Sequence, residues 1–131
     1  MSRSDASALR ARLIAQRVVP VLRLASADET RLAVDCLIEA GFGCIEITLT
    51  TPGAVELIAE LRGRLGPECS VGAGTVLDLE SAGACIAADA DFLVAPCMVA
   101  GMAAKAHAAG RLALIGGYTP GEVLAAGREG A

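Results

Sequence analysis

Aromatic side chains are nearly missing from this sequence, and long apolar runs are missing altogether. There is no tryptophan, and one tyrosine and two phenylalanines make up 2% of the 131 residues. Apolar residues nevertheless reach 54%, so the core must be built from Ala, Val, Leu and Ile. That composition suits helices packed on buried strands better than a β-sandwich. No uncharged apolar run approaches the roughly 18 residues of a membrane helix, so we expect no membrane partner.

Basic charge and metal ligands are also scarce. The net charge of −4 argues against a nucleic-acid partner. The five cysteines are odd in number and contain no C-x-x-C pair, which indicates small core residues in a reducing compartment. His107 is the only histidine and has no ligand cluster around it, so we expect no metal site and no cofactor. The polar, helix-like N-terminus lacks the apolar segment of a signal peptide, so the expected location is the cytoplasm.

What the sequence does contain is an alternation of two segment types, which we assign to one domain over residues 1–131. Short apolar runs bounded by Gly, Pro or polar residues predict buried strands. They are Val18–Leu22, Cys44–Leu49, Ser70–Ala73, Phe92–Ala95 and Leu112–Ile115. Amphipathic stretches of helical period lie between and after them. They are Ala27–Ala40, Ala54–Leu65, Leu79–Ala87, Val99–Ala109 and Pro120–Ala126.

Successive strand–helix units predict a parallel sheet with helical crossovers. Two α/β architectures fit this pattern, an open doubly wound sheet or an incomplete (β/α)8 TIM barrel of about five βα units with an N-terminal helix. A complete barrel needs about 250 residues, so length favours the open sheet. The residues inside the strands favour the barrel.

Glu46 is the residue that decides between them. Ile45, Ile47 and Leu49 share one face of their strand, and Cys44, Glu46 and Thr48 share the other. Both faces of an open doubly wound sheet are covered by helices, where an unpaired carboxylate would be costly. In a barrel one face points to the interior, and a carboxylate near the carboxyl ends of the strands is typical of a catalytic residue.

The strands on either side add matching groups. Arg23 comes at the carboxyl end of the first strand, on the same face as Val19 and Val21. The third strand leads into Gly72-Ala73-Gly74-Thr75, where the glycines would let the backbone approach a ligand and Thr75 supplies a hydroxyl. A guanidinium, a carboxylate and a hydroxyl on three successive strands predict a site for a small polar substrate.

Structural interpretations stand beside these. Arg23 and Glu46 could form only an ion pair between neighbouring strands, and the Gly-Ala-Gly-Thr stretch could be only a strand-to-helix turn. One of the threonines before Pro52 could cap the following helix. Lys105 and His107 are expected on the surface, and Cys97 and Tyr118 follow the fourth and fifth strands. Thr119 and Glu122 have the spacing of a capping box. The threonines before Pro52 that could cap the helix are Thr48, Thr50 and Thr51.

From about Arg17 onward the sequence resembles the keto-deoxy-phosphogluconate and keto-hydroxyglutarate aldolases, pyruvate-dependent (β/α)8 barrels of the Schiff-base class. Four segments in order carry the resemblance, and their combination is far more specific than any one of them. They are Val19-Pro20-Val21-Leu22-Arg23, Gly41-Phe42-Gly43-Cys44-Ile45-Glu46-Ile47-Thr48-Leu49, Val71-Gly72-Ala73-Gly74-Thr75-Val76-Leu77 and Gly117-Tyr118-Thr119-Pro120-Gly121-Glu122.

The resemblance implies roles for these residues. Glu46 would move protons during carbon–carbon cleavage, Arg23 would contact the anionic end of the substrate, and Thr75, with Gly74, would hold the pyruvate carboxylate. The implied reaction cleaves 2-keto-3-deoxy-6-phosphogluconate or 4-hydroxy-2-oxoglutarate to pyruvate and an aldehyde. The substrate is thus a small, phosphorylated or simple keto acid, and the implied assembly is a homo-oligomer, a trimer by resemblance.

The sequence also departs from the family pattern. Thr50 stands where the sugar-acid aldolases often carry an arginine, and Ile115 where a proline is usual. The Schiff-base lysine of the family belongs to a sixth strand, a few residues beyond Ala131, and the phosphate-binding loops lie further on. Lys105 has a helical setting and is not expected to replace that lysine, so the chain should be inactive alone. The alternatives are a non-catalytic α/β remnant or assembly module, and another phosphate-handling barrel, which would not need Glu46 and Arg23 together.

Overall fold

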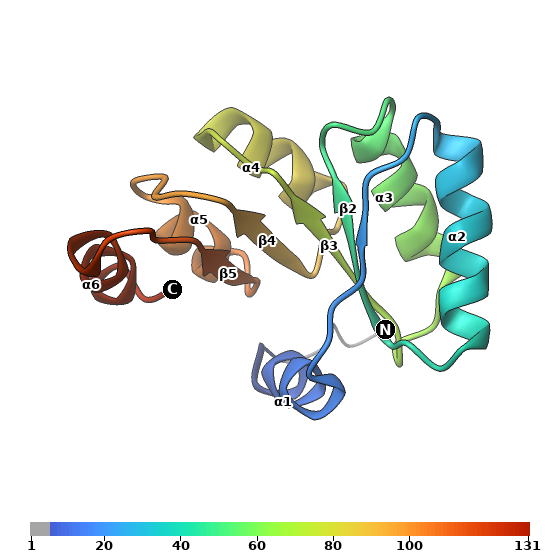
Figure 1. Cartoon of the computed structure of the whole chain (residues 1–131), viewed down its shortest axis with the longest axis horizontal. Coiled ribbons are helices and arrows are strands. Elements are labelled where there is room, and N and C mark those ends of the chain that lie inside the picture. The colour runs from blue at the N-terminus through green and yellow to red at the C-terminus, as the bar shows by residue number, and fades with distance from the viewer. Residues whose placement is uncertain (1–5) are drawn as a thin grey trace.

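The computed structural model describes residues 6–131 and shows one five-stranded parallel sheet in the order β1-β2-β3-β4-β5 (Figure 1). The strands are β1 (Val21–Leu22), β2 (Cys44–Thr48), β3 (Ser70–Gly74), β4 (Phe92–Ala95) and β5 (Leu112–Ile115). The helices are α1 (Ala6–Gln16), α2 (Ala27–Glu39), α3 (Ala54–Arg64), α4 (Leu79–Ala87), α5 (Met102–Ala108) and α6 (Pro120–Arg128). Sequential strand order is the winding of a barrel, and the sheet stays open between β5 and β1.

The register of the strands divides the side chains between two faces. Glu46 pairs with Val21 on one side and Gly72 on the other, and Gly72 in turn pairs with Phe92. Paired residues of neighbouring parallel strands point to the same face, and the next residue along each strand points to the opposite one. Glu46 therefore shares an inner face with Gly72 and Phe92, while Ile47 and its row lie on the outer face.

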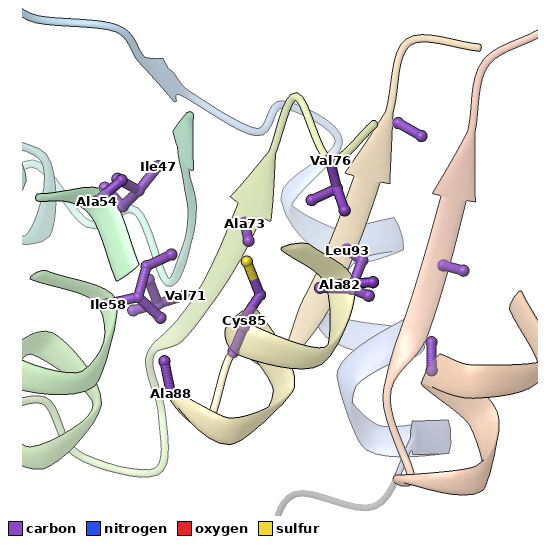
Figure 2. Close-up of a cluster of buried hydrophobic side chains, with 14 of the residues drawn as sticks. Ile47, Ala54, Ile58, Val71, Ala73, Val76, Ala82, Cys85, Ala88 and Leu93 are labelled. Carbon is purple, nitrogen blue, oxygen red and sulfur yellow. The ribbon is translucent and has the colours of Figure 1, made fainter. Parts of the chain in front are cut away.

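The outer face carries the main core. Ile47, Ala73 and Leu93 form a row across β2, β3 and β4 and have no more than 1% of their surface exposed. Ile58 of α3 and Cys85 of α4 cover them from the helix layer (Figure 2). Each large side chain buried in this way contributes about 1.5–3 kcal/mol. Helices α3 and α4 therefore cover the outer face, whereas Glu46 lies on the inner face.

Phe92 occupies part of the inner face beside Gly72. Its ring lies over Gly72, since a Cβ placed on that glycine would come within 2.1 Å of the ring. Phe92 is fully buried, as is Cys44 two residues before Glu46 on the same face. The glycine in β3, which pairs with both Glu46 and Phe92, therefore makes room for the aromatic ring on the inner face.

Helix α1 lies against the amino ends of the strands (Figure 1). Gln16 fixes it to the start of β2, where its Oε1 accepts from the N–H groups of Gly43 and Cys44 at 2.7 and 2.8 Å and its Nε2 donates to the Cys44 carbonyl at 2.8 Å. Arg12 Nη1 donates to Ser70 Oγ at the start of β3. These bonds satisfy backbone groups at the end of the sheet opposite to the carboxyl ends of the strands.

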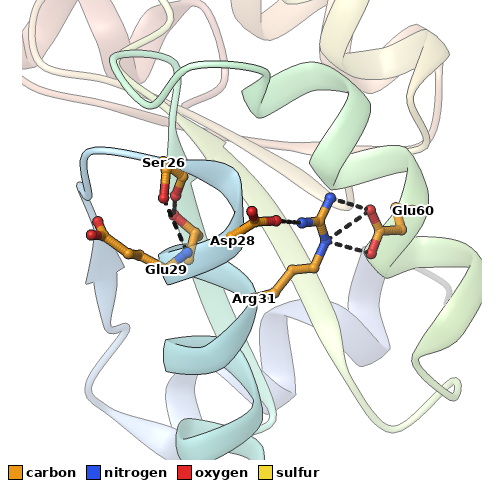
Figure 3. Close-up of polar contacts among 6 residues, drawn as sticks. Ser26, Asp28, Glu29, Arg31 and Glu60 are labelled. Atoms are coloured by element: carbon orange, nitrogen blue, oxygen red, sulfur yellow. Dashed lines mark hydrogen bonds and ion pairs between the residues drawn. The ribbon is translucent and has the colours of Figure 1, made fainter.

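Helix α2 begins at a side-chain cap and is joined to α3 by an ion pair (Figure 3). Ser26 Oγ accepts from the Glu29 N–H at 3.2 Å, as its residue type predicts for an N-cap. Arg31 forms a bidentate pair with Glu60 of α3, with both shortest contacts at 2.8 Å. Since both side chains are partly open to solvent, the pair fixes geometry more than it adds stability.

The predicted α/β class and incomplete-barrel architecture are confirmed, and the corrections concern element ends. The first strand is shorter than predicted and begins at Val21, because Pro20 has no N–H for the ladder. Helix α5 begins at Met102 rather than Val99, since Gly101 precedes it with φ near 81°. Helix α6 runs on to Arg128. The threonines do not cap α3, whose N-cap is Gly53 without a side-chain bond. The predicted Thr119–Glu122 capping box is present.

Candidate active site

The polar residues predicted from the sequence come together at the carboxyl ends of β1, β2 and β3. Arg23 follows β1 directly, Glu46 lies in the middle of β2, and Gly74 ends β3 with Thr75 after it. In parallel sheets the carboxyl ends of all strands lie at one edge, so loops and strand ends there share one site. The structure thus joins a cation, a carboxyl group and a hydroxyl from three separate strands.

Glu46 is the buried member of this group. Its side chain is 8% exposed and bends over Gly74, since a Cβ placed on that glycine would come within 1.7 Å of Oε1. Burial raises the pKa of Glu46, and the nearby charge of Arg23 opposes that rise without cancelling it. A carboxyl group whose pKa is moved toward neutrality by burial is suited to take and return a proton.

Arg23 is held by hydroxyl groups. Its Nη1 donates to Thr50 Oγ1 at 3.0 Å and its Nη2 to Thr75 Oγ1 at 3.3 Å. Within residues 6–131, the direct hydrogen bonds of the Arg23 guanidinium run to these hydroxyls, and Arg23 acts on Glu46 through its charge. The guanidinium is oriented by neutral groups and keeps its charge available to an anion.

Thr75 adopts an unusual backbone conformation where it contacts Arg23. Its φ is 60°, a left-handed value that β-branched residues rarely adopt. Such conformations persist where the surrounding structure fixes them, and they are common at functional sites. Here the left-handed turn directly after β3 accompanies the contact between the Thr75 hydroxyl and the Arg23 guanidinium.

The other candidate residues with reactive side chains are exposed to solvent. Lys105 is exposed on α5, and its Nζ lies near Gly83 of α4 on the outer helical layer. His107 is exposed on the same helix, Cys97 is exposed after β4, and Tyr118 is 100% exposed. Within residues 6–131, no three His, Cys, Asp or Glu side chains gather as metal ligands.

Sequence reasoning missed two structural partners of the site. The sequence predicts Phe92 in a buried strand but not the position of its ring over Gly72. The hydrogen bond between the hydroxyls of Thr48 and Thr50, at 2.8 Å, is not among the roles that the sequence predicts for these threonines. The alternation of faces in β2 was a usable signal for Thr48, which shares its face with Glu46.

Comparison with known protein families identifies the family that this sequence matches. The family model for KDPG and KHG aldolases, the keto-deoxy-phosphogluconate and keto-hydroxyglutarate enzymes, matches residues 9–130. The chain belongs to this aldolase family. The resemblance found in the sequence is therefore confirmed over nearly the whole chain, and the rival of an unrelated phosphate-handling barrel is excluded. The family is one of lyases, which makes the chain part of an enzyme family.

Individual aldolases are also similar to this chain in sequence or in fold. A probable 2-dehydro-3-deoxy-6-phosphogalactonate aldolase of Rhizobium meliloti (strain 1021) is 32% identical over 87% of this chain and 54% of its own length. A solved 4-hydroxy-2-oxoglutarate/2-dehydro-3-deoxyphosphogluconate aldolase from TTHB1 is 36% identical, with a TM-score of 0.78 over 92% of this chain and 58% of that one. A KDPG aldolase from Legionella pneumophila, 20% identical, shares the fold with a TM-score of 0.78 over 98% and 57%. The chain thus spans about half the length of these relatives.

In the described part of this aldolase-family chain, none of the helices combines the length and apolar character that crossing a bilayer demands.

Glu46→Gln is expected to stabilise the chain at neutral pH. Because burial raises the pKa of Glu46, the folded state favours the protonated carboxyl, which glutamine imitates. Stability from such a group is complete below the unfolded pKa, about 4.3 for Glu, and is lost as pH rises through the folded pKa. Urea midpoints of the two proteins should therefore agree at acid pH and separate in favour of the variant toward pH 7. Glu56→Gln, at an exposed position of α3, is the control, and equal midpoints at pH 7 would contradict the prediction.

Proposed function

We propose that this chain forms the first half of an aldolase that cleaves 2-keto-3-deoxy-6-phosphogluconate or 4-hydroxy-2-oxoglutarate to pyruvate and an aldehyde. The observation that carries the proposal is the buried carboxyl of Glu46 at the open inner face, with the Arg23 guanidinium beside it. Family membership supports the reaction class. The proposed setting is the cytoplasm, with a small keto acid as the partner and a homotrimer as the assembly.

In the proposed reaction Glu46 acts as the proton carrier. The carboxylate takes the proton of the substrate hydroxyl as the adjacent carbon–carbon bond breaks, and that hydroxyl becomes the carbonyl of the departing aldehyde. The electron pair of the broken bond moves into an iminium formed between the keto carbon and a lysine amine, which gives an enamine. Protonation of the enamine carbon and hydrolysis then release pyruvate and regenerate the amine. Arg23 and Thr75, with the open backbone at Gly74, hold the carboxylate during these steps.

The amine in this scheme has to come from outside residues 1–131. Lys105 is the only lysine of the sequence and lies on α5, in the helical layer that covers the outer face. Glu46 and Arg23 lie on the inner face, on the other side of the sheet. The proposal therefore assigns proton transfer and carboxylate binding to this chain and the Schiff base to the strands that complete the barrel.

A completed barrel tests this proposal. Residues 1–131 would be fused to the C-terminal part of the 36%-identical aldolase, and pyruvate release from both keto acids would be followed in a coupled assay. We expect turnover from the fusion and none from the 131-residue chain. Borohydride with pyruvate should trap an adduct in the fusion only, and Lys105→Arg should leave its activity unchanged. An adduct on Lys105, or turnover by the chain alone, would overturn the division of roles.

The second candidate, a binding or assembly module without catalysis, is favoured by one surface. A cavity of about 570 Å³ lies between the free edge of β5 and α6, with Leu114, Ile115 and Val123 in its lining. Leu114 and Val123 are 37% and 58% exposed. Unpaired strand edges beside apolar surface are sites for association. If the fusion is well folded but inactive, this candidate replaces the first.

A further inference from the structure

The orientation of Arg23 is unusually well defined for an exposed residue. A long arginine side chain on a surface samples many rotamers, and fixing one costs side-chain entropy. Both terminal nitrogens of Arg23 nevertheless bond to protein hydroxyls, Nη1 to Thr50 and Nη2 to Thr75. Two bonds from one planar group set both the position and the plane of the guanidinium. The groups that hold these two hydroxyls therefore determine the position of the Arg23 charge.

Thr50 is held by a buried neighbour. Its Oγ1 lies 2.8 Å from Oγ1 of Thr48, a residue with 0% of its surface exposed. Thr48 Oγ1 in turn donates to the backbone carbonyl of Leu22 at 3.1 Å. Because Leu22 directly precedes Arg23 in the chain, the bonds close a ring from the Arg23 guanidinium through two hydroxyls to the backbone beside Arg23.

Chemistry fixes the direction of every bond in this ring. The carbonyl of Leu22 can only accept, so the single proton of Thr48 is directed to it. Thr48 must then accept the proton of Thr50, and Thr50 has its lone pairs left for Arg23, which can only donate. Hydrogen bonds arranged head to tail in this way polarise one another. The Oγ1 atom of Thr50 therefore acts as the acceptor for the Arg23 guanidinium.

The simpler role of a helix cap does not explain Thr50. The N-cap of helix α3 is Gly53, and no side-chain hydrogen bond caps the helix. Thr51, the next threonine, has its own partner in the N–H of Leu24 at 3.4 Å. Within residues 6–131, the hydrogen bonds of Thr50 Oγ1 run to Arg23 and Thr48. The Thr50 hydroxyl therefore binds the Arg23 guanidinium instead of capping a helix.

We propose that Thr50, supported by Thr48, is a positioning residue that holds the Arg23 guanidinium over the inner face to receive the carboxylate of a keto acid. This inference rests on the proposed function for its ligand, but the ring of hydrogen bonds does not depend on it. A guanidinium has five N–H donors, and the two hydroxyls use two of them. The remaining donors suit a carboxylate, which binds arginine side chains in a bidentate manner.

Glu46 supplies a second reporter of this arrangement. The charge of Arg23 acts against the burial that raises the pKa of Glu46. If the guanidinium leaves its place, that opposition weakens and the pKa of Glu46 rises further. The same substitution should therefore change two separate observables, the side-chain signals of Arg23 and the titration of Glu46.

The test uses NMR of the 131-residue chain with pyruvate as the probe. Arg23 side-chain nitrogen signals, assigned by their loss in Arg23→Lys, should show restricted rotation in the wild-type chain and shift on addition of pyruvate. Thr50→Val, which keeps the shape but removes the hydroxyl, should release the rotation and weaken pyruvate binding about tenfold, as expected for one hydrogen bond to a charged group. The Glu46 carboxyl should then titrate at higher pH.

Thr50→Ser keeps the hydroxyl and should restore all three readouts, which a loss of packing at Thr50 would not allow. Unchanged Arg23 signals and an unchanged Glu46 titration in Thr50→Val would overturn the role of Thr50, whatever pyruvate does. A wild-type chain with restricted Arg23 signals but no response to pyruvate would instead count against the proposed function, since the ring would exist without its ligand.

Discussion

Glu46→Gln in the completed barrel is expected to lower the turnover number by roughly two to four orders of magnitude, the usual contribution of a positioned acid–base group. Glutamine keeps the shape of the side chain and its place over Gly74 but cannot take a proton from the substrate hydroxyl. The Michaelis constant should change little, because the proposed reaction assigns binding of the carboxylate to Arg23 and Thr75. Steady-state rates of pyruvate release over a range of substrate concentrations give both values.

The pH dependence separates a catalytic role from a structural one. A raised pKa for Glu46 predicts that activity of the completed barrel falls on the acid side as the carboxylate becomes protonated, and that this limb is missing from the residual activity of Glu46→Gln. The exposed Glu56→Gln should keep both rate and profile. Wild-type turnover in Glu46→Gln would show that another group moves the proton. The urea midpoint of the same variant, expected to be higher at neutral pH, tests whether unfolding explains the lost activity.

The sequence was sufficient for the parts of the site that depend on periodicity. Alternation of two segment types predicted the parallel sheet, and alternation within β2 placed Glu46 on the face away from the helices. Arg23, Gly74 and Thr75 followed because the carboxyl ends of parallel strands meet at one edge. These inferences need only local pattern and the geometry of a parallel sheet.

Contacts between loops and across distant positions could not be predicted in the same way. The ring through Thr48, Thr50 and Arg23 depends on the side-chain directions of a turn after β2, which no period determines. The left-handed φ of Thr75 was equally hidden, because β-branched residues seldom adopt it. Both features are local departures from regular geometry, and they lie at the site.

A buried charge cluster at the amino ends of the strands was missed for a different reason. It joins Arg62 of α3, Asp91 before β4 and Arg111 before β5, positions far apart in the sequence. Each residue by itself resembles an ordinary charged residue near the end of an element. Only the sheet order brings them together, and Asp91 and Arg111 are then 4% and 5% exposed.

Asp91→Ala is expected to lower the free energy of unfolding by about 3–5 kcal/mol, the cost of leaving a buried charge without its partner. Asp91 Oδ2 accepts from the Val71 N–H at 2.8 Å and lies 3.2 Å from Arg62 Nε, and Oδ1 lies 3.7 Å from Arg111 Nη1. Burial raises the pKa of Asp91, and the backbone bond and both arginines oppose the rise. The ionised carboxylate is thus not itself favoured by burial. The loss in the variant comes from Arg62, whose ion pair is with Asp91, and from the Val71 N–H, which loses its acceptor, whereas Arg111 keeps its ion pair with Asp89.

Urea denaturation of the 131-residue chain measures the effect, and three variants locate its cause. Asp91→Asn keeps an acceptor for the Val71 N–H and should cost less than alanine. In Asp91→Ala/Arg62→Leu one stranded charge is removed as well, so the double loss should fall short of the sum by about 0.5–3 kcal/mol. Asp35→Ala breaks an exposed pair with Arg64 at 2.8 Å and should cost about 1 kcal/mol or less. If Asp35→Ala and Asp91→Ala lower the free energy of unfolding equally, burial of the cluster does not increase the effect of losing the carboxylate. A larger loss at Asp91 shows that the buried cluster at the amino ends of the strands stabilises the sheet.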